Sequence, residues 1–146
     1  MKKINLLIGL PGSGKSTWLS GKDKNCVFDD ISQTDPLLHR LKTISIEDCD
    51  EIWISDVNFC DKKILIKALD VMMSIFGKEI IFNFIIFDVN EYFCRLGVEN
   101  RNDGRNVMAS IDRFSKTIGE SVLYIKENFN FNTESYCLTS VLKRKP

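Results

Sequence analysis

A run of nine residues near the amino terminus, Gly9 to Thr17, combines the residue types that bind a polyphosphate. The pattern G-x-x-x-x-G-K-[ST] is matched at every specified position by Gly-Leu-Pro-Gly-Ser-Gly-Lys-Ser. An apolar run, Ile4 to Ile8, leads into it and a helix is predicted from Lys15, so that backbone N–H groups and a helix N-terminus converge on an anion. The predicted nucleotide-binding residues are Gly9, Gly12, Ser13, Gly14, Lys15, Ser16 and Thr17.

Each residue type in this loop has a chemical role. Glycines allow the backbone to approach phosphates closely, since they carry no side chain. Lys15 is expected to reach the β- and γ-phosphates of ATP, and the Ser16 hydroxyl is expected to bind Mg²⁺. The alternative interpretation of the motif is a tight turn between strand and helix that binds no ligand.

Carboxylates follow two further predicted strands. Asp29 and Asp30 follow the apolar residues 26–28, and Asp56 follows the strand predicted at residues 51–55. In open α/β sheets ligands bind beyond the carboxyl ends of the strands. One carboxylate there can take the proton of an acceptor hydroxyl, the role we expect of Asp29 or Asp30, and another, Asp56, can orient the acceptor or metal-bound water. The alternative role for each is a helix N-cap or a solvated loop acid.

Arginines gather in a polar stretch, residues 97–106, which has no apolar periodicity. Arg101 and Arg105 lie in it and Arg95 precedes it, between helices predicted near residues 91–96 and 111–129. The pattern predicts a short mobile lid whose guanidinium groups neutralise charge on the transferring phosphoryl group. A solvated loop between helices is the alternative.

Strands and helices alternate along the chain, which predicts an α/β fold with a parallel sheet of about five strands between helices. Asp61 is a candidate N-cap for a helix that ends at Gly77. The chain of 146 residues, 44% of them hydrophobic, is predicted to form a single domain over residues 1–146. Strands are predicted at residues 4–8, 26–28, 51–55, 79–87 and 135–142.

Composition limits the classes of protein to which the chain can belong. Twenty basic residues balance twenty acidic ones, so a global positive field for coating nucleic acid is excluded. The apolar residues 80–87 are too few to cross a bilayer, and we expect no membrane partner. His39 is the one histidine, which argues against histidine-dependent triads and multi-histidine metal sites. No obligate protein partner is indicated.

The five cysteines are odd in number and widely spaced, at positions 26, 49, 60, 94 and 137. This spacing indicates neither a zinc knuckle nor a disulfide framework. A reducing cytoplasm is the expected location.

Four elements in this order together resemble the kinase domain of phage polynucleotide 5′-hydroxyl kinase, over the chain from its start to about residue 120. They are the phosphate loop, the Asp29-Asp30 pair, Ser55-Asp56-Val57-Asn58, and Arg101-Asn102-x-x-Arg105. The resemblance implies a P-loop NTPase-type three-layer sandwich. It also implies that Asp29 is the general base, that Asp56 helps to position the acceptor, and that Arg101 and Arg105 hold the donor phosphates.

The expected activity is therefore transfer of the γ-phosphate of ATP to a hydroxyl, with the 5′-hydroxyl end of DNA or RNA as the favoured acceptor. At the position of Ser32 the family has an arginine that binds a phosphate of the acceptor strand. Arg40 and His39 are the candidates to replace it in this chain. A kinase acting on a small molecule, a nucleotide or a modified base is the first alternative. A nucleotide-binding switch without phosphotransfer is the second. The family's C-terminal phosphatase domain is not expected here.

Overall fold

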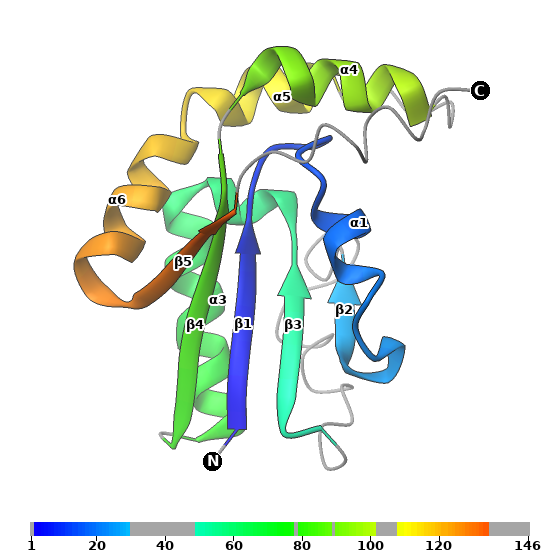
Figure 1. Cartoon of the computed structure of the whole chain (residues 1–146). Coiled ribbons are helices and arrows are strands. Elements are labelled where there is room, and N and C mark those ends of the chain that lie inside the picture. Colours follow the sequence, from blue (N-terminus) through cyan, green and yellow to red (C-terminus); the bar gives the residue numbers. More distant parts are fainter. Residues whose placement is uncertain (1, 30–48, 78, 89, 102–107, 135–146) are drawn as a thin grey trace.

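The computed structural model describes residues 2–29, 49–77, 79–88, 90–101 and 108–134. Within these ranges the chain forms an α/β fold around an all-parallel sheet of five strands in the order β2-β3-β1-β4-β5 (Figure 1). The strands are β1 (Lys2–Ile8), β2 (Val27–Asp29), β3 (Glu51–Ser55), β4 (Ile80–Phe87) and β5 (Asn130–Glu134).

Strand β1 lies at the centre of the sheet and is buried on both faces, as its apolar run predicts. Leu6 is in register with Ile54 of β3 on one side and with Phe84 of β4 on the other. Because all strands are parallel, their carboxyl ends lie at one edge of the sheet, the upper edge in Figure 1. The residues that follow β1 and β3, and Asp29 at the end of β2, are therefore brought to the same edge.

Helices pack against both faces of the sheet. Helices α3 (Lys62–Phe76) and α6 (Ile118–Asn128) bury Leu65 and Ile125 with β1 residues Ile4 and Leu6 in one core. On the opposite face, α1 (Lys15–Leu19) buries Leu19 in a second, smaller core. Helices α4 (Glu91–Arg101) and α5 (Met108–Ser115) lie across the carboxyl edge (Figure 1). None of the helices in the described ranges is long and apolar enough to cross a membrane.

The predicted helix between Asp61 and Gly77 is confirmed with both of its ends. The Asp61 carboxylate accepts hydrogen bonds from the backbone N–H groups of Lys63 and Ile64, at 2.9 and 3.3 Å. Gly77 ends the helix with φ at 87°, a positive angle that glycine adopts without strain. The strand predicted at residues 51–55 is confirmed too.

Three predicted boundaries are wrong. Helix α4 continues to Arg101, so residues 97–101 of the predicted lid are helical. The helix predicted over residues 111–129 is divided, because α5 ends at Ser115 and α6 begins at Ile118. The last strand of the sheet is residues 130–134, which the prediction left between a helix and a strand. The predicted strand, 135–142, lies outside the described residues.

Cys26 and Cys49 form a disulfide, which corrects the expectation that the chain has none. Cys26 ends the 3₁₀ turn η1 (Lys24–Cys26) ahead of β2, and Cys49 lies just ahead of β3. The two residues are 23 positions apart in the sequence, yet parallel pairing of β2 with β3 places their Cα atoms 5.9 Å apart. The inference from cysteine spacing therefore no longer supports a cytoplasmic location.

The disulfide is expected to stabilise the fold by about 3 kcal/mol, because it closes a loop of about two dozen residues in the unfolded chain. Equilibrium urea unfolding of the wild-type protein should show this loss on addition of dithiothreitol. A Cys26→Ala, Cys49→Ala double variant should match the reduced protein and be insensitive to the reductant. Equal unfolding midpoints with and without reductant would contradict the assignment.

Candidate functional site

The predicted phosphate loop leaves the carboxyl end of β1 and turns sharply into α1. Gly12 and Gly14 have φ angles of 80° and 98°, in the left-handed region that favours glycine. The Ser13 N–H donates to the Leu10 carbonyl at 3.1 Å, which closes the turn. Gly14 is the N-cap of α1, and the Trp18 N–H donates to its carbonyl at 2.9 Å. The strand, loop and helix start that the motif predicts are therefore confirmed.

The Lys15 ammonium is enclosed by the backbone of this loop. Its Nζ donates to the carbonyls of Gly9 at 2.6 Å and Leu10 at 2.9 Å, and lies 3.4 Å from the Ser13 hydroxyl. These acceptors hold a positive charge at a defined point at the carboxyl edge of the sheet. The loop therefore holds the Lys15 ammonium in a defined position, next to a tight backbone turn that contains glycines.

Helix α1 is short, and aromatic packing anchors it to the sheet. Leu19 is buried, and the Trp18 ring meets Phe87 edge to face at 6.3 Å between centroids. Ser16 and Thr17, by contrast, are exposed at the start of the helix. The Ser16 hydroxyl is therefore accessible to a ligand, while the helix that carries it is held in place.

Helix α4 lies directly against the loop at Gly12. A Cβ atom built on Gly12 would lie 2.2 Å from the carbonyl oxygen of Cys94 and 3.1 Å from a methyl group of Val98. Both the positive φ and this contact require glycine here. The loop is therefore clamped between the sheet and the backbone of α4.

Gly12→Ala is expected to destabilise the protein by about 2 kcal/mol or more. The left-handed backbone costs about 1–2 kcal/mol for a residue with a Cβ, and overpacking typically adds about 1–3 kcal/mol. Gly21→Ala is the matched control, since a Cβ there meets nothing within 4 Å. Urea unfolding of both variants checks this, and equal stability of the two would show that α4 does not clamp the loop.

Asp56 lies beside the loop, at the end of β3, and is fully buried. One of its carboxylate oxygens accepts from the Asn58 N–H at 2.8 Å and caps the 3₁₀ turn η2 (Val57–Cys60). The N-cap role considered for this residue is therefore present. The cap also fixes the orientation of the carboxylate at the carboxyl edge.

Cys60, at the end of η2, is a residue of the site that the sequence did not reveal. Its thiol donates to the Gly9 carbonyl at 3.4 Å, the same carbonyl that holds Lys15. Burial raises the pKa of this thiol to about 12; the Lys15 charge and the Gly9 bond oppose this rise, and Asp56 adds to it. Cys60 therefore stays a neutral thiol near pH 7 and supports the loop as a hydrogen-bond donor.

Asp29 is the last residue of β2 and is in register with Ser55, which is in register with Leu7 of β1. With about 4.8 Å between neighbouring strands, its backbone lies about 10 Å from β1 at the level where the phosphate loop begins. The Ser55 hydroxyl between them is buried and has no hydrogen-bond partner among the described residues. Asp30, the alternative base, lies outside the described residues.

Of the arginines in and before the predicted lid, the structure describes Arg95 and Arg101. Arg101 is the last residue of α4, and Arg105 lies outside the described residues, as do Ser32, His39 and Arg40. Arg95, on the same helix as Arg101, forms an ion pair with Asp112 of α5. Arg95 therefore joins the two helices that cross the carboxyl edge.

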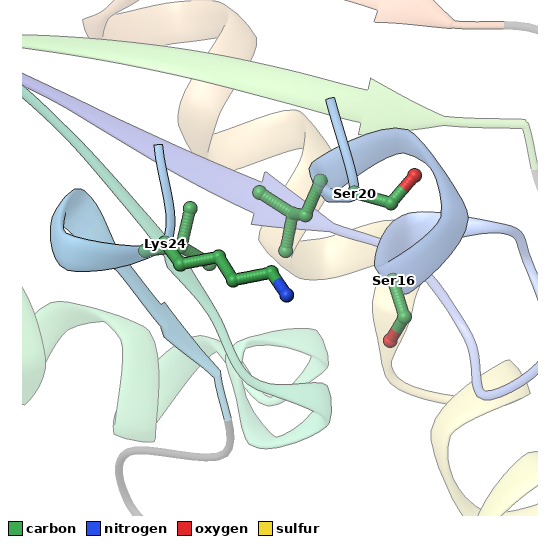
Figure 2. A pocket seen from close by; sticks show the side chains of 5 residues that line it. Ser16, Ser20 and Lys24 are labelled. Carbon is green, nitrogen blue, oxygen red and sulfur yellow. The ribbon is translucent and has the colours of Figure 1, made fainter. Parts of the chain in front are cut away.

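A cavity of about 290 Å³ lies between α1 and the start of β2 (Figure 2). It adjoins the predicted phosphate loop through Ser16, and through Val27 it adjoins β2, which ends at Asp29. Its lining residues in the described ranges are Ser16, Leu19, Ser20, Lys24 and Val27.

The donor set at this edge fits Mg²⁺ bound together with a polyphosphate. Across the ranges that the structure describes, no three His, Cys, Asp or Glu side chains gather as a self-contained metal site. Mg²⁺ is usually held by one or two protein oxygens and by phosphate oxygens. The exposed Ser16 hydroxyl is the protein oxygen that would serve.

Comparison with known proteins leaves the family open. No protein-family profile matches the chain. The chain is similar to an uncharacterized protein, R277, of Acanthamoeba polyphaga mimivirus, with 27% identity over 139 residues. The similarity covers 90% of this chain and 96% of the viral protein, so the two correspond over nearly their whole lengths.

Proposed function

We propose that the protein is an ATP-dependent kinase that transfers the γ-phosphate to a hydroxyl group, with the 5′-hydroxyl end of DNA or RNA as the favoured acceptor. The observation that carries this proposal is the enclosed Lys15 ammonium, 2.6 and 2.9 Å from two loop carbonyls at the carboxyl edge of a parallel sheet. Ligands of open α/β sheets bind at that edge.

In the proposed mechanism the loop holds the donor. Lys15 would neutralise charge on the β- and γ-phosphates, and Ser16 would hold Mg²⁺, which neutralises further phosphate charge when bound. The Gly9 carbonyl accepts hydrogen bonds from both the Lys15 ammonium and the Cys60 thiol, which links the lysine to η2. These contacts fix the cation before substrate arrives, which is the source of electrostatic catalysis.

The acceptor would lie over β2 and β3. Its hydroxyl oxygen attacks the γ-phosphorus, the bond from that phosphorus to the bridging oxygen of ADP breaks, and Asp29 takes the hydroxyl proton. Asp56, held by its cap on η2, would orient the acceptor from the neighbouring strand. Arg101 and Arg105 remain candidates for neutralising the transferring group.

A kinase for a small hydroxyl-bearing substrate, such as a nucleoside, a nucleotide or a modified base, is the second candidate. The observation in its favour is the size of the cavity beside Ser16, about 290 Å³, which is at the lower end of the usual range for small-ligand sites.

One assay separates these functions. The protein is incubated with γ-labelled ATP and Mg²⁺ and with a panel of 5′-hydroxyl DNA, 5′-hydroxyl RNA, nucleosides and nucleoside monophosphates. The proposal expects label on oligonucleotide 5′ ends, with a KM that improves over the first few nucleotides. Equal use of a nucleoside would favour the small-substrate kinase. ATP binding without transfer to any acceptor would favour a nucleotide-binding switch.

A further inference from the structure

The Gly9 carbonyl accepts two hydrogen bonds in the predicted phosphate loop, one from a group that must move when a nucleotide binds and one from a group that need not. Gly9 is buried directly after β1, where the Lys15 ammonium donates to its carbonyl oxygen at 2.6 Å. The Cys60 thiol, at the end of η2, donates to the same oxygen at 3.4 Å. A carbonyl oxygen has two lone pairs, so it can accept both hydrogen bonds at once.

The Lys15 ammonium directs its hydrogen bonds at the loop itself. An ammonium has three N–H donors. The loop offers it the carbonyls of Gly9 and Leu10, at 2.6 and 2.9 Å, and the Ser13 hydroxyl at 3.4 Å. A phosphate oxygen therefore gains a hydrogen bond from this ammonium only when an acceptor of the loop gives one up. We expect Lys15 to leave at least one buried carbonyl when the phosphates of ATP bind.

A buried carbonyl that loses its donor destabilises the state in which the loss occurs. Each of the two carbonyls has a second donor. The Leu10 carbonyl also accepts from the Ser13 N–H at 3.1 Å. For the Gly9 carbonyl, the Cys60 thiol is the donor that remains within the described residues once Lys15 has turned. Release of Lys15 therefore leaves neither carbonyl unpaired, and for Gly9 this depends on the thiol.

The Cys60 thiol is held in place and keeps its proton. The residue is fully buried, and the Thr117 hydroxyl donates to its backbone carbonyl at 2.8 Å, which ties the end of η2 to the start of α6. Burial raises the pKa of the thiol to about 12, although the Lys15 charge lowers it. Movement of Lys15 away from the thiol therefore leaves the sulfur protonated near pH 7 and able to donate.

We propose that Cys60 is a positioning residue for nucleotide binding: its thiol keeps the Gly9 carbonyl hydrogen-bonded while the Lys15 ammonium exchanges that carbonyl for the phosphates of ATP. The inference rests on the proposed nucleotide site and adds to it a residue that itself contacts no phosphate. Without the thiol, binding of ATP leaves a buried carbonyl without a donor, and the affinity for ATP falls. The ATP-free protein does not lose this pairing, because Lys15 donates to the same carbonyl there.

Cys60→Ala and Cys60→Ser separate the hydrogen bond from the packing of the side chain. Both variants lose the sulfur atom, and serine keeps a donor. Lost packing affects the ATP-free and the ATP-bound protein alike, so it changes the free energy of unfolding and cancels from the dissociation constant for ATP. Calorimetric titration with ATP and Mg²⁺ should give a Kd about five- to tenfold higher for Cys60→Ala than for the wild type, a modest loss because a thiol is a weak donor. Cys60→Ser should return the Kd to within about twofold of the wild-type value.

Ser121→Ala is the matched control for the loss of a buried polar atom. The Ser121 hydroxyl is also fully buried, on α6, and it has no hydrogen-bond partner in the described parts of the chain. Its removal should leave the Kd for ATP at the wild-type value, and urea unfolding verifies that all three variants are folded. Equal Kd values for Cys60→Ala and Ser121→Ala would overturn the inference, as would a Cys60→Ser variant that binds ATP as weakly as Cys60→Ala.

The S–H stretching band of Cys60 tests the same inference in the wild-type protein. A carbonyl oxygen that no longer bonds an ammonium is a stronger acceptor, so the S–H bond weakens when Lys15 turns to the phosphates. The infrared band, identified by its loss in Cys60→Ser, should move to lower wavenumber on addition of ATP and Mg²⁺. Lys15→Met should show the lower wavenumber without ATP. An unchanged band in the ATP-bound wild type overturns the inference, whether or not Cys60→Ala folds.

The titration contains no acceptor, which separates this inference from the kinase function. Weaker ATP binding by Cys60→Ala with recovery in Cys60→Ser supports the positioning role even if no acceptor is phosphorylated, in which case the kinase proposal alone fails. Phosphotransfer by the wild type together with an unchanged Kd for Cys60→Ala refutes the positioning role alone. No binding of ATP by the wild type at millimolar concentration overturns both.

Discussion

Lys15→Met is expected to lower phosphotransfer by about 10²- to 10³-fold or more, the usual effect of removing one fixed group that stabilises transition-state charge. The structure adds a second reason to expect a large loss of phosphotransfer activity. Lys15 donates to the carbonyls of Gly9 and Leu10, so its removal leaves these loop acceptors without their cation. Single-turnover transfer from labelled ATP to the best acceptor of the panel measures the effect.

Lys63→Met is the control for this variant, because Lys63 is exposed at the start of α3, on the opposite face of the sheet from α1. It should transfer phosphate at the wild-type rate. Calorimetric titration with ATP shows how much of the Lys15 effect is lost binding rather than lost catalysis. Full activity of Lys15→Met would remove the central support for a nucleotide site at this loop.

Asp29→Asn is expected to lower the transfer rate by about 10²- to 10⁴-fold while ATP binding stays close to that of the wild type. A positioned general base contributes a factor of this size, and asparagine keeps the shape of the side chain without its basicity. Asp29 ends β2 in register with Ser55, about 10 Å from β1, so the substitution is remote from the donor loop. Pre-steady-state transfer rates at saturating ATP provide the measurement.

Asp30→Asn is the control for the base, since the sequence leaves either member of the pair as the candidate. Asp30→Asn should be close to wild type. A sensitive Asp30 together with a silent Asp29 would move the assignment by one residue, and two silent variants would exclude a general base at the end of β2.

Local sequence determines much of this protein. The glycine pattern from Gly9 to Lys15 predicts a turn between strand and helix, because its two positive φ angles, at Gly12 and Gly14, are positions where other residues are strained. Asp61 and Gly77 predict both ends of α3, since capping depends on neighbouring backbone groups. Strand β3, which ends at Ser55, is predicted because a short run rich in isoleucine and tryptophan favours extended backbone.

Hydrophobic periodicity does not reveal the break between two helices when the same apolar stripe continues through both. Ile111, Phe114, Ile118 and Ile125 keep helical spacing through the break between α5 and α6, and all four are buried. At the break the Thr117 hydroxyl donates to the Cys60 carbonyl at 2.8 Å, a residue 57 positions away in the sequence. The spacing of apolar residues in one segment does not predict such a contact, because the contact depends on how η2 packs against the helices.

The remaining features of the site are decided by tertiary structure alone. Pairing of β2 with β3 brings Cys26 to Cys49, and packing of α4 places the Cys94 carbonyl against Gly12. The same folding brings the Cys60 thiol to the Gly9 carbonyl and places Lys24 and Ser16 around one pocket. Each of these contacts joins groups whose meeting depends on strand order and helix packing. Residue types and spacing therefore predict the phosphate loop, whereas its supports and the neighbouring cavity arise from contacts between segments distant in sequence.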